Sequence, residues 1–514
     1  DGASNNGSGR RIASSPNADT IQEMRVESSN FDSSVGHGTG LQISMMTRAG
    51  TNAYRGTTNY QYWTNKLNAL NPSQRLTLKP GTVGRELYGD GRSHNLALTA
   101  GGPIVNNKLF FFGSYSYVND YIPGKNQGSS TVPANEKHLS GDFSDLLLLP
   151  NPAQYQIYDP LTVRPDPNNP NRYIRSPFPN NIIPADRIVN PLYNLYRQML
   201  PTPNQNFVEN GTTPSANYYR GGEPDTPVSS LFGGRIDYIP SGSDRLFFRG
   251  SGSTFLEGVN DWTYENPTFN GLHSFDRSRY TWAGIGNWTH VFGATVVDTQ
   301  VASNEFFQDD LYSRLHDYKP SDMGLPTYLD ALCQSQDNDC MLPVIGIGGY
   351  QGISFGASSG DRTRNLQIKS DITSVRGAHT LRTGVDFRTA ERERGPGGNP
   401  SGNLQFTNEF TRQASDTAQL TPSNLGLSMA AFMLGIPSTA SATIQGTTVT
   451  QNKYLGVHAQ DTWRINRNLT LNVGLRVEWE NGVKEVDGRM LVDFDPTARL
   501  AISDAAEAAY ARAP

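Results

Sequence analysis

The feature that most restricts the fold is a repeated pair of long alternating segments joined by a very short turn. The pairs are 231–239 with 244–256, 279–291 with 294–308, 365–375 with 379–392, and 453–465 with 468–480. Apolar and polar residues alternate within each segment, which is typical of a β-strand with one apolar face. Long polar stretches separate the pairs. The chain is therefore predicted to be a series of antiparallel β-hairpins.

The alternation is clearest in segment 468–480. One face carries Leu469, Leu471, Val473, Leu475, Val477 and Trp479, and the other carries Thr470, Asn472, Gly474, Arg476, Glu478 and Glu480. Segments 365–375 and 379–392 follow the same rule, with Leu366, Ile368, Ile372, Leu381, Val385 and Phe387 on the apolar side. One face of the whole sheet is therefore expected to be apolar.

Segment length separates two all-β architectures. Strands of soluble sandwiches usually have about five or six residues with turns every 8 to 12. Here the segments reach about 13 residues, and very short turns alternate with long loops, which is typical of an outer-membrane β-barrel whose apolar face meets lipid. Aromatic residues near segment ends are candidates for interfacial girdles: Tyr60, Tyr62, Trp63, Tyr115, Tyr117, Trp282, Trp288, Trp463 and Trp479. A soluble β protein with these aromatics in its core stays the alternative.

Three earlier segments complete the strand count. Residues 93–101 and 108–121 form a hairpin around GPIVNN, and 53–63 form one more strand, which makes eleven. Lipid does not tolerate the open edges of such a set. The fold class is therefore predicted as a partial transmembrane antiparallel β-barrel, with further strands beyond Pro514 in a barrel of roughly 22 or more.

Composition agrees with a turn-rich β protein. Gly (51) and Pro (32) are abundant, aromatics make up 10 % and charged residues only 18 %. The net charge of −5 gives no reason to expect nucleic-acid binding. The longest aliphatic cluster, Leu146 to Leu149, ends at Pro150 and falls far short of the roughly 18 apolar residues of a membrane-spanning helix.

The sequence indicates no enzymatic chemistry. HExxH, GxSxG, P-loop and paired CxxC motifs are absent and the eight histidines are scattered, so no catalytic residue, cofactor or metal site is predicted. The glycine-rich GIGGYQGISFG (346–356) is interpreted as a flexible loop and RTAERERG (388–395) as a solvated strand extension. Cys333 and Cys340 are candidates for a local disulfide in an exported protein. A cation site with Asp337 and Asp339 is the weaker alternative.

Several stretches resemble one family in the expected order. They include IQEMRVESSNFDSSVGHGTGLQISMMTRAGTNAYRG (21–56), GGPIVNNKLFFFGSY (101–115), GDFSD (141–145), IYDPLT (157–162), FPNNIIPADRI (178–188), LPTPN (200–204) and QDTWRINRNLTLNVGLRVEW (460–479). Together the chain resembles the Oar-like branch of the TonB-dependent outer-membrane receptors. It departs from that family at His37-Gly38-Thr39-Gly40 and at Met45-Met46, where an Arg/Ser-Gly-Gly run and valines are more usual.

The resemblance implies a domain organisation. Residues 1–52 would be the C-terminal part of a plug, with Leu41 to Thr47 as its last strand and RAGTN as a periplasmic turn. Residues 53–514 would be the N-terminal half of the barrel, with extracellular loops at 64–92, 122–229, 258–278, 310–364 and 394–452. In the first barrel strand, Tyr54, Thr58, Tyr60 and Tyr62 would face lipid, whereas Arg55, Asn59 and Gln61 would face the lumen.

Eight charged residues are predicted on the lumen face, where they would line the substrate path or hydrogen-bond the plug: Arg55, Lys369, Asp371, Arg382, Asp386, Arg388, Arg476 and Glu478. Mutual pairing in a wet interior is the alternative interpretation.

The resemblance also implies a function and partners. The expected activity is TonB-dependent transport across the outer membrane, energised through the plug, and the enlarged loops favour a bulky extracellular substrate such as a peptide, protein or glycan. The expected partners are TonB, outer-membrane lipid and that unidentified substrate. A passive porin or a surface adhesin without TonB coupling stays the alternative function.

Overall fold

The computed structural model describes residues 16–27, 32–36, 42–77, 79, 90–204, 213, 215–259, 275–311, 318–334, 340–353, 359–413, 426–489, 495, 497–499 and 501–511. The candidate cation ligands Asp337 and Asp339 lie outside these residues. No helix among the described segments is both long and apolar enough to span a membrane.

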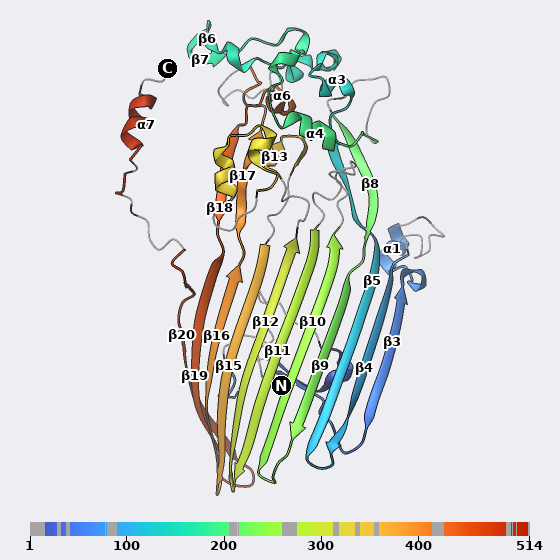
Figure 1. Cartoon of the computed structure of the whole chain (residues 1–514), viewed down its shortest axis with the longest axis vertical. Helices are drawn as coiled ribbons and strands as arrows, with labels where there is room; N and C mark the ends of the chain where they lie inside the picture. The colour runs from blue at the N-terminus through green and yellow to red at the C-terminus, as the bar shows by residue number, and fades with distance from the viewer. Residues whose placement is uncertain are drawn as a thin grey trace.

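A long, curved antiparallel sheet dominates the fold (Figure 1). Neighbouring strands of this sheet follow the order β20-β19-β16-β15-β12-β11-β10-β9-β5-β4-β3. The strands are β3 (Arg55–Thr64), β4 (Arg92–Val105), β5 (Leu109–Val132), β9 (Val228–Tyr238), β10 (Asp244–Val259), β11 (Phe275–Phe292), β12 (Thr295–Leu311), β15 (Ser359–Arg376), β16 (His379–Arg394), β19 (Thr448–Arg464) and β20 (Thr470–Glu480). These are the eleven predicted strands, so the predicted fold is confirmed.

Several strands run further than predicted. The predicted strand 108–121 is only the first part of β5, which continues to Val132 and pairs there with β8 (Ala216–Asp225). Likewise β15 begins at Ser359 and pairs with the whole of β16. The alternation of apolar and polar residues ends before these strands do. Their backbone pairing continues beyond the last apolar residues.

The two faces of the sheet have inverted polarity. Gln367, Asp371 and Asp386 on the concave face are at most 8 % exposed, although they are polar. On the opposite, convex face Ile368 is 40 % exposed and Val457 is 49 % exposed. A soluble sheet protein would bury the apolar face, so the arrangement contradicts the soluble alternative and fits a sheet whose convex face meets lipid.

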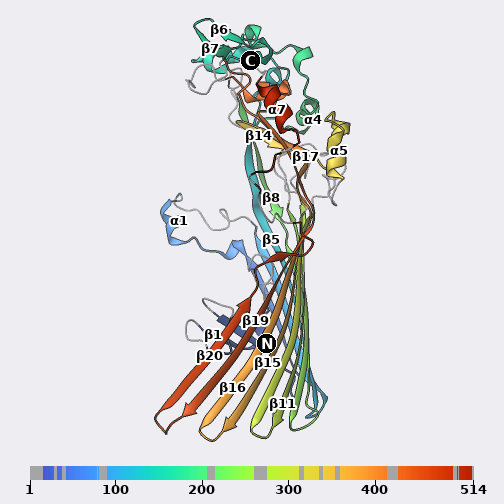
Figure 2. The ribbon, with the colours of Figure 1, turned by 90° about the vertical axis from the view of Figure 1, so that its left-hand side faces the viewer.

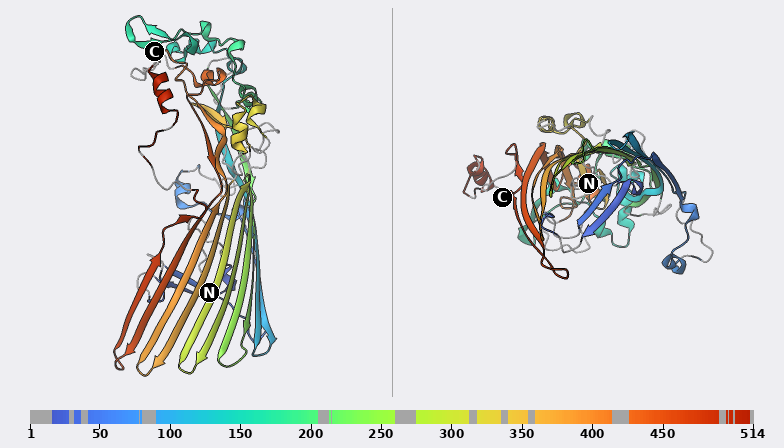
Figure 3. Two further views of the ribbon diagram at one scale, coloured as in Figure 1. Left: turned by 60° about the vertical axis from the view of Figure 1, so that its left-hand side comes forward. Right: turned by 90° about the horizontal axis from the view of Figure 1, so that it is seen from below.

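A small two-stranded unit lies on the concave side. β1 (Ile21–Glu27) pairs with β2 (Gln42–Thr47) in antiparallel register, preceded by the short helix η2 (Ala18–Thr20). Figure 2 and the right panel of Figure 3 show this unit within the hollow of the sheet. β2 coincides with the predicted strand that ends at Thr47. The assignment of residues 1–52 to a plug stays a prediction.

At the end of the sheet opposite the short turns, three long connections fold together (Figure 1). We call their described residues 133–204, 318–334, 340–353, 397–413 and 426–445 the loop unit. A four-stranded sheet has the order β14-β13-β17-β18, from β13 (Val344–Ile347), β14 (Tyr350–Ile353), β17 (Gly397–Phe406) and β18 (Thr439–Gln445). The other elements of the loop unit are α3 (Glu136–Leu139), η4 (Ser144–Leu148), η5 (Pro152–Tyr155), η6 (Pro160–Thr162), β6 (Arg164–Asp166), β7 (Asn169–Ile174), η7 (Pro179–Asn181), η8 (Ala185–Arg187), α4 (Tyr193–Met199), η9 (Pro320–Met323), α5 (Tyr328–Cys333) and α6 (Ser428–Met433).

The loop unit has its own hydrophobic core. Phe432 on α6 is fully buried, and its ring centroid lies 5.0 Å from that of Tyr196 and 5.0 Å from that of Phe406. Ile345, Ile347 and Ile353 are also buried in this core. The interpretation of 346–356 as a flexible loop is therefore wrong for residues 346–353, because the β13–β14 hairpin buries its isoleucines; residues 354–358 lie outside the described part.

The two cysteines lie in the loop unit. The sulfur atoms of Cys333, at the end of α5, and Cys340 are bonded to each other, and both residues are buried. The next residues, Met341 and Leu342, enter the hydrophobic core. The bond thus fixes the point at which the chain enters that core. The remaining short elements are η3 (Asn65–Leu67), α1 (Pro72–Thr77), β21 (Lys484–Glu485) and α7 (Ser503–Tyr510).

Candidate functional site

Four adjacent strands bring polar side chains together on the concave face. In the ladder, Lys369 of β15 lies opposite Asp386 of β16, which lies opposite Gly456 of β19, which lies opposite Glu478 of β20. Two residues further along each strand, the next row is Asp371, Gly384, His458 and Arg476. Because alternate residues share a face, both rows point into the same space. We call these residues, with Arg382, Arg388 and Tyr454, the lumen cluster.

Asp371 is the centre of one half of the lumen cluster. Its carboxylate lies 3.2 Å from Lys369 Nζ, 3.4 Å from Arg382 Nη2 and 3.2 Å from His458 Nε2. The side chain of His458 is fully buried. One carboxylate therefore stands among three basic groups from three strands.

Asp386 is the centre of the other half and is only 2 % exposed. Arg388 Nη2 donates to its Oδ2 at 2.6 Å, and Gln367 Nε2 donates to its Oδ1 at 3.0 Å. Arg476 Nη2 lies 3.7 Å away and donates to the Tyr454 hydroxyl at 2.7 Å. A buried carboxylate is stable only with such partners, which accounts for the density of basic groups around it.

Two glycines make room for these long side chains. A Cβ atom at Gly384 would lie 2.3 Å from Asp371 Oδ1 and 2.6 Å from His458 Cε1. A Cβ atom at Gly456 would lie 2.4 Å from Arg476 Nη2. Each of the two rows thus has a glycine, and the side chains of the adjacent strands occupy the space above it.

Residues 32–36, between β1 and β2, contact the lumen cluster directly; we call them the contact segment. Arg382 Nη1 lies 3.3 Å from Asp32 Oδ2. The amide and hydroxyl of Ser33 donate to Gln460 Oε1 at 3.1 and 2.9 Å, and Arg476 Nη1 donates to the Ser33 carbonyl at 3.2 Å. The contact segment is therefore joined to three strands of the wall.

The charge of Asp32 matches this environment. Burial favours the neutral carboxyl, but hydrogen bonds from Ser34 and the nearby charge of Arg382 outweigh it, so the pKa of Asp32 is lowered below its ordinary value. The carboxylate at the contact is thus ionised at neutral pH.

Close approach of the contact segment also depends on glycine. A Cβ atom at Gly36 would lie 1.9 Å from Glu478 Oε1 and 2.1 Å from Arg476 Nε. On the wall, a Cβ atom at Gly474 would lie 3.0 Å from Ser33 Cβ. The backbone of the contact segment therefore lies directly against β20.

The structure brings together seven of the eight predicted lumen charges, and Arg55 is the exception. Arg55 lies at the start of β3, near one end of the strand order, and within the described residues it forms no ion pair. Sequence reasoning missed five further residues of the site: Asp32, Ser33, Tyr454, His458 and Gln460. The last three share the inward alternation of segment 453–465, which could have revealed them, whereas no pattern marked Asp32 and Ser33.

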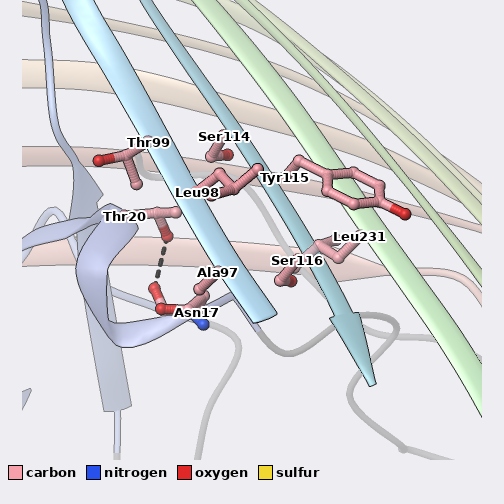
Figure 4. A pocket seen from close by; sticks show the side chains of 9 residues that line it. All are labelled: Asn17, Thr20, Ala97, Leu98, Thr99, Ser114, Tyr115, Ser116 and Leu231. Atoms are coloured by element: carbon pink, nitrogen blue, oxygen red, sulfur yellow. Dashed lines mark hydrogen bonds between the residues drawn. The ribbon is translucent and has the colours of Figure 1, made fainter. Parts of the chain in front are cut away.

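A second contact joins the concave unit to the wall at the other end of the strand order. A small pocket there is lined by Asn17, Thr20, Ala97, Leu98, Thr99, Ser114, Tyr115, Ser116 and Leu231 (Figure 4). The inward residues of β4 and β5 at this point are small, so η2 can lie close to the strands. The Thr20 hydroxyl donates to the Asn17 carbonyl at 2.6 Å. The pocket is thus part of the interface.

Comparison with known families gives the assignment. The sequence matches the family described as outer membrane beta barrel domain over residues 46–513. The chain belongs to this family. The outer membrane barrel domain accordingly resides in the outer membrane, and its exposed apolar face is the lipid-facing surface.

Three solved structures are similar to this chain at low sequence identity. The outer membrane transporter YddB from Escherichia coli is 8 % identical with a TM-score of 0.47, and the match covers 91 % of this chain and 44 % of that chain. FpvA from P. aeruginosa is 9 % identical with a TM-score of 0.43, covering 93 % and 45 %. The siderophore receptor PirA from Acinetobacter baumannii is 8 % identical with a TM-score of 0.39, covering 87 % and 42 %.

The barrel domain thus spans less than half the length of these structures. A comparison with curated protein sequences found no match. The described residues contain no group of three or more His, Cys, Asp and Glu side chains suited to a metal ion. The narrower resemblance to the Oar-like branch stays a prediction.

Proposed function

We propose that this barrel domain belongs to an energised outer-membrane transporter, and that the contact segment is part of a plug that closes the barrel at rest. The observation that carries the proposal is the joining of residues 32–36 to the lumen cluster through Arg382, Gln460 and Arg476. A plug is a segment of this kind, held on the inner wall by polar contacts that can be broken without unfolding the strands.

The contact is suited to repeated opening. The Arg382 and Asp32 side chains are each 33 % exposed, and such pairs contribute about 1 kcal/mol or less. The hydrogen bonds at Ser33 add a similar amount each. The barrel strands, in contrast, are joined by continuous backbone ladders. A pulling force would therefore release the contact segment before it disturbed the wall.

The size of the loop unit favours a bulky substrate. Its hydrophobic core fixes three long connections as one folded body above the barrel. A folded body of this size offers a broad recognition surface, which suits a peptide, protein or glycan. By family resemblance TonB would supply the pulling force through the plug.

Two measurements test the proposal on the full-length protein. We expect it to bind the periplasmic domain of TonB in a pull-down. We also expect cells that produce the Arg382→Ala/Arg476→Ala variant to become sensitive to a large hydrophilic antibiotic, whereas wild-type cells stay resistant. Absence of TonB binding, together with equal permeability of wild type and variant, would favour the passive porin or adhesin.

A further inference from the structure

We infer that the lipid-facing rim at the short-turn end of the sheet carries two binding sites for the ammonium group of a phospholipid headgroup. One site surrounds Asp244 and the other surrounds Asp461. The inference rests on the outer-membrane location and the local geometry, and it is independent of the transport proposal.

The first site places a carboxylate among aromatic rings. Asp244 Oδ1 lies 2.6 Å from His290 Nδ1 and accepts a hydrogen bond from Trp288 Nε1 at 3.1 Å, while Ser241 Oγ donates to its Oδ2 at 2.8 Å. The His290 ring centroid lies 3.9 Å from that of Phe292 and 5.6 Å from that of Trp288.

The second site repeats this combination in the next pair of hairpins along the sheet. His379 Nδ1 lies 2.7 Å from Asp461 Oδ2, and the His379 ring stacks on Trp463 with 5.3 Å between centroids. In the ladder, Arg376 lies opposite His379. Carboxylate, imidazole and tryptophan therefore occur together twice, in sequences that are otherwise unlike.

Both sites lie on the lipid-facing side at the edge of the apolar surface. Trp288 lies opposite Leu246, and Asp461 lies opposite Leu381, so both share the face of these exposed leucines. The turns at 239–243, 293–294 and 377–378 follow within a few residues, at the lower end of the sheet in Figure 1. Short turns of outer-membrane barrels lie on the periplasmic side, which places the sites among the headgroups of the inner leaflet.

The chemistry of the sites favours a cation. Asp244 is 27 % exposed and Asp461 is 32 % exposed at the side chain, whereas the Asp461 Oδ1 atom itself is buried and has no hydrogen-bond partner among the described residues. Trp288 and Trp463 are 39 % and 40 % exposed, and the faces of aromatic rings attract cations. A primary ammonium would donate hydrogen bonds to the carboxylate while lying against the indole. At the second site, the guanidinium of Arg376 would bind the phosphate of the same headgroup.

The experiment compares lipids retained by the full chain in detergent, measured by native mass spectrometry after addition of phosphatidylethanolamine or phosphatidylglycerol. We expect wild type to retain phosphatidylethanolamine roughly tenfold better, and the Asp244→Asn/Asp461→Asn variant to lose the difference. Asp298→Asn is the matched control, because Asp298 pairs with Thr289 at the same height but faces inward. It is expected to keep the preference.

Equal retention of the two lipids by wild type, or an unchanged preference in the double variant, would overturn the inference. Heat-modifiable migration on a gel reports whether each variant is folded. If the double variant does not fold, the single variants decide: each is expected to lose one of two bound phosphatidylethanolamine molecules, and retention of both would refute the sites.

Discussion

Arg382 of the barrel wall lies between two carboxylates, with its Nη1 3.3 Å from Asp32 of the contact segment and its Nη2 3.4 Å from Asp371 of the neighbouring strand. Asp371 would hold the guanidinium in place if the contact segment left the wall. Asp371 therefore orients the Arg382 side chain toward Asp32.

Removing this partner should loosen the contact segment without unfolding the barrel. We expect Arg382→Ala to raise the reactivity of a cysteine at Ser33 toward a maleimide about twofold to fivefold, because exposed ion pairs contribute less than about 1 kcal/mol. Arg388→Ala is the control, since Arg388 bonds to Asp386 within the wall. Equal effects of the two variants would contradict the assigned role of Arg382.

Exchanging the charges of Asp32 and Arg382 should not restore the contact between them. In the variant Asp32→Arg/Arg382→Asp, the new carboxylate at position 382 would lie beside Asp371, which now bonds to Arg382. Like charges at this distance repel. We expect the double variant to show at least the cysteine reactivity of Arg382→Ala, and full recovery would show that Asp371 has no part in the contact.

A methyl group at Gly36 should displace the contact segment more strongly than loss of the ion pair. The added Cβ would lie 1.9 Å from Glu478 Oε1 and 2.1 Å from Arg476 Nε. Either these side chains must give up their bond to each other and the bond from Arg476 to the Ser33 carbonyl, or the backbone must move away from β20. We expect Gly36→Ala to exceed Arg382→Ala in the same labelling assay. Gly482→Ala is the control, because a Cβ atom there meets no described atom within 4 Å.

The barrel strands could be predicted because each depends on a local pattern. Alternation alone places Leu471 and Arg476 on opposite faces of the strand, and the short turns determine which strands pair. The lumen cluster followed from the same rule for Asp371, Asp386 and Arg476. The contact of Asp32 with Arg382 joins residues 350 positions apart, and no periodicity records which residues of a non-repeating segment will meet the wall.

The loop unit escaped prediction for a related reason. Its core residues, such as Ile345 and Phe432, stand in short apolar runs between glycines and prolines, a composition that suits a mobile loop equally well. They are buried only because three distant connections supply each other's apolar surface. A segment of GIGGYQGI alone cannot show that its isoleucines have partners.

Truncation of the loop-unit core should separate the stability of that unit from that of the barrel. Phe432 is fully buried among Tyr193, Tyr196 and Phe406, and Phe432→Ala should cost about 3–5 kcal/mol. We expect proteases added to intact cells to cleave the unit in this variant while heat-modifiable migration persists. Leu148→Ala, at a position 82 % exposed, should behave as wild type.

Acid should weaken the loop unit through Asp159. Hydrogen bonds from Arg187, at 2.7 and 2.9 Å, lower the pKa of Asp159 below its ordinary value. Its contribution to stability is therefore present above about pH 4 and is lost as the pH falls through the lowered pKa. In Asp159→Asn, protease resistance of the unit should be lower at pH 7 and should fall less between pH 5 and pH 2. A fall as steep as in wild type would assign the acid sensitivity to other groups.

Opening the disulfide should release the chain that follows it. Cys333→Ser/Cys340→Ser removes a cross-link over seven positions, which should cost the loop unit about 2 kcal/mol. We expect earlier thermal loss of protease resistance in the unit and an unchanged barrel. Addition of a reductant to wild type should reproduce the effect, and an unaffected unit would show that core packing of Met341 and Leu342 suffices.

The joint core of the three connections also makes folding of the loop unit depend on distant parts of the chain. The Asn190 side chain donates to the carbonyl of Phe432, 242 positions later in the chain. The first connection therefore cannot complete its core until residues 428–433 lie against it. Contacts of such long range form slowly and leave apolar surface uncovered in the meantime. The loop unit thus folds only after the hairpins between its connections have brought those connections together.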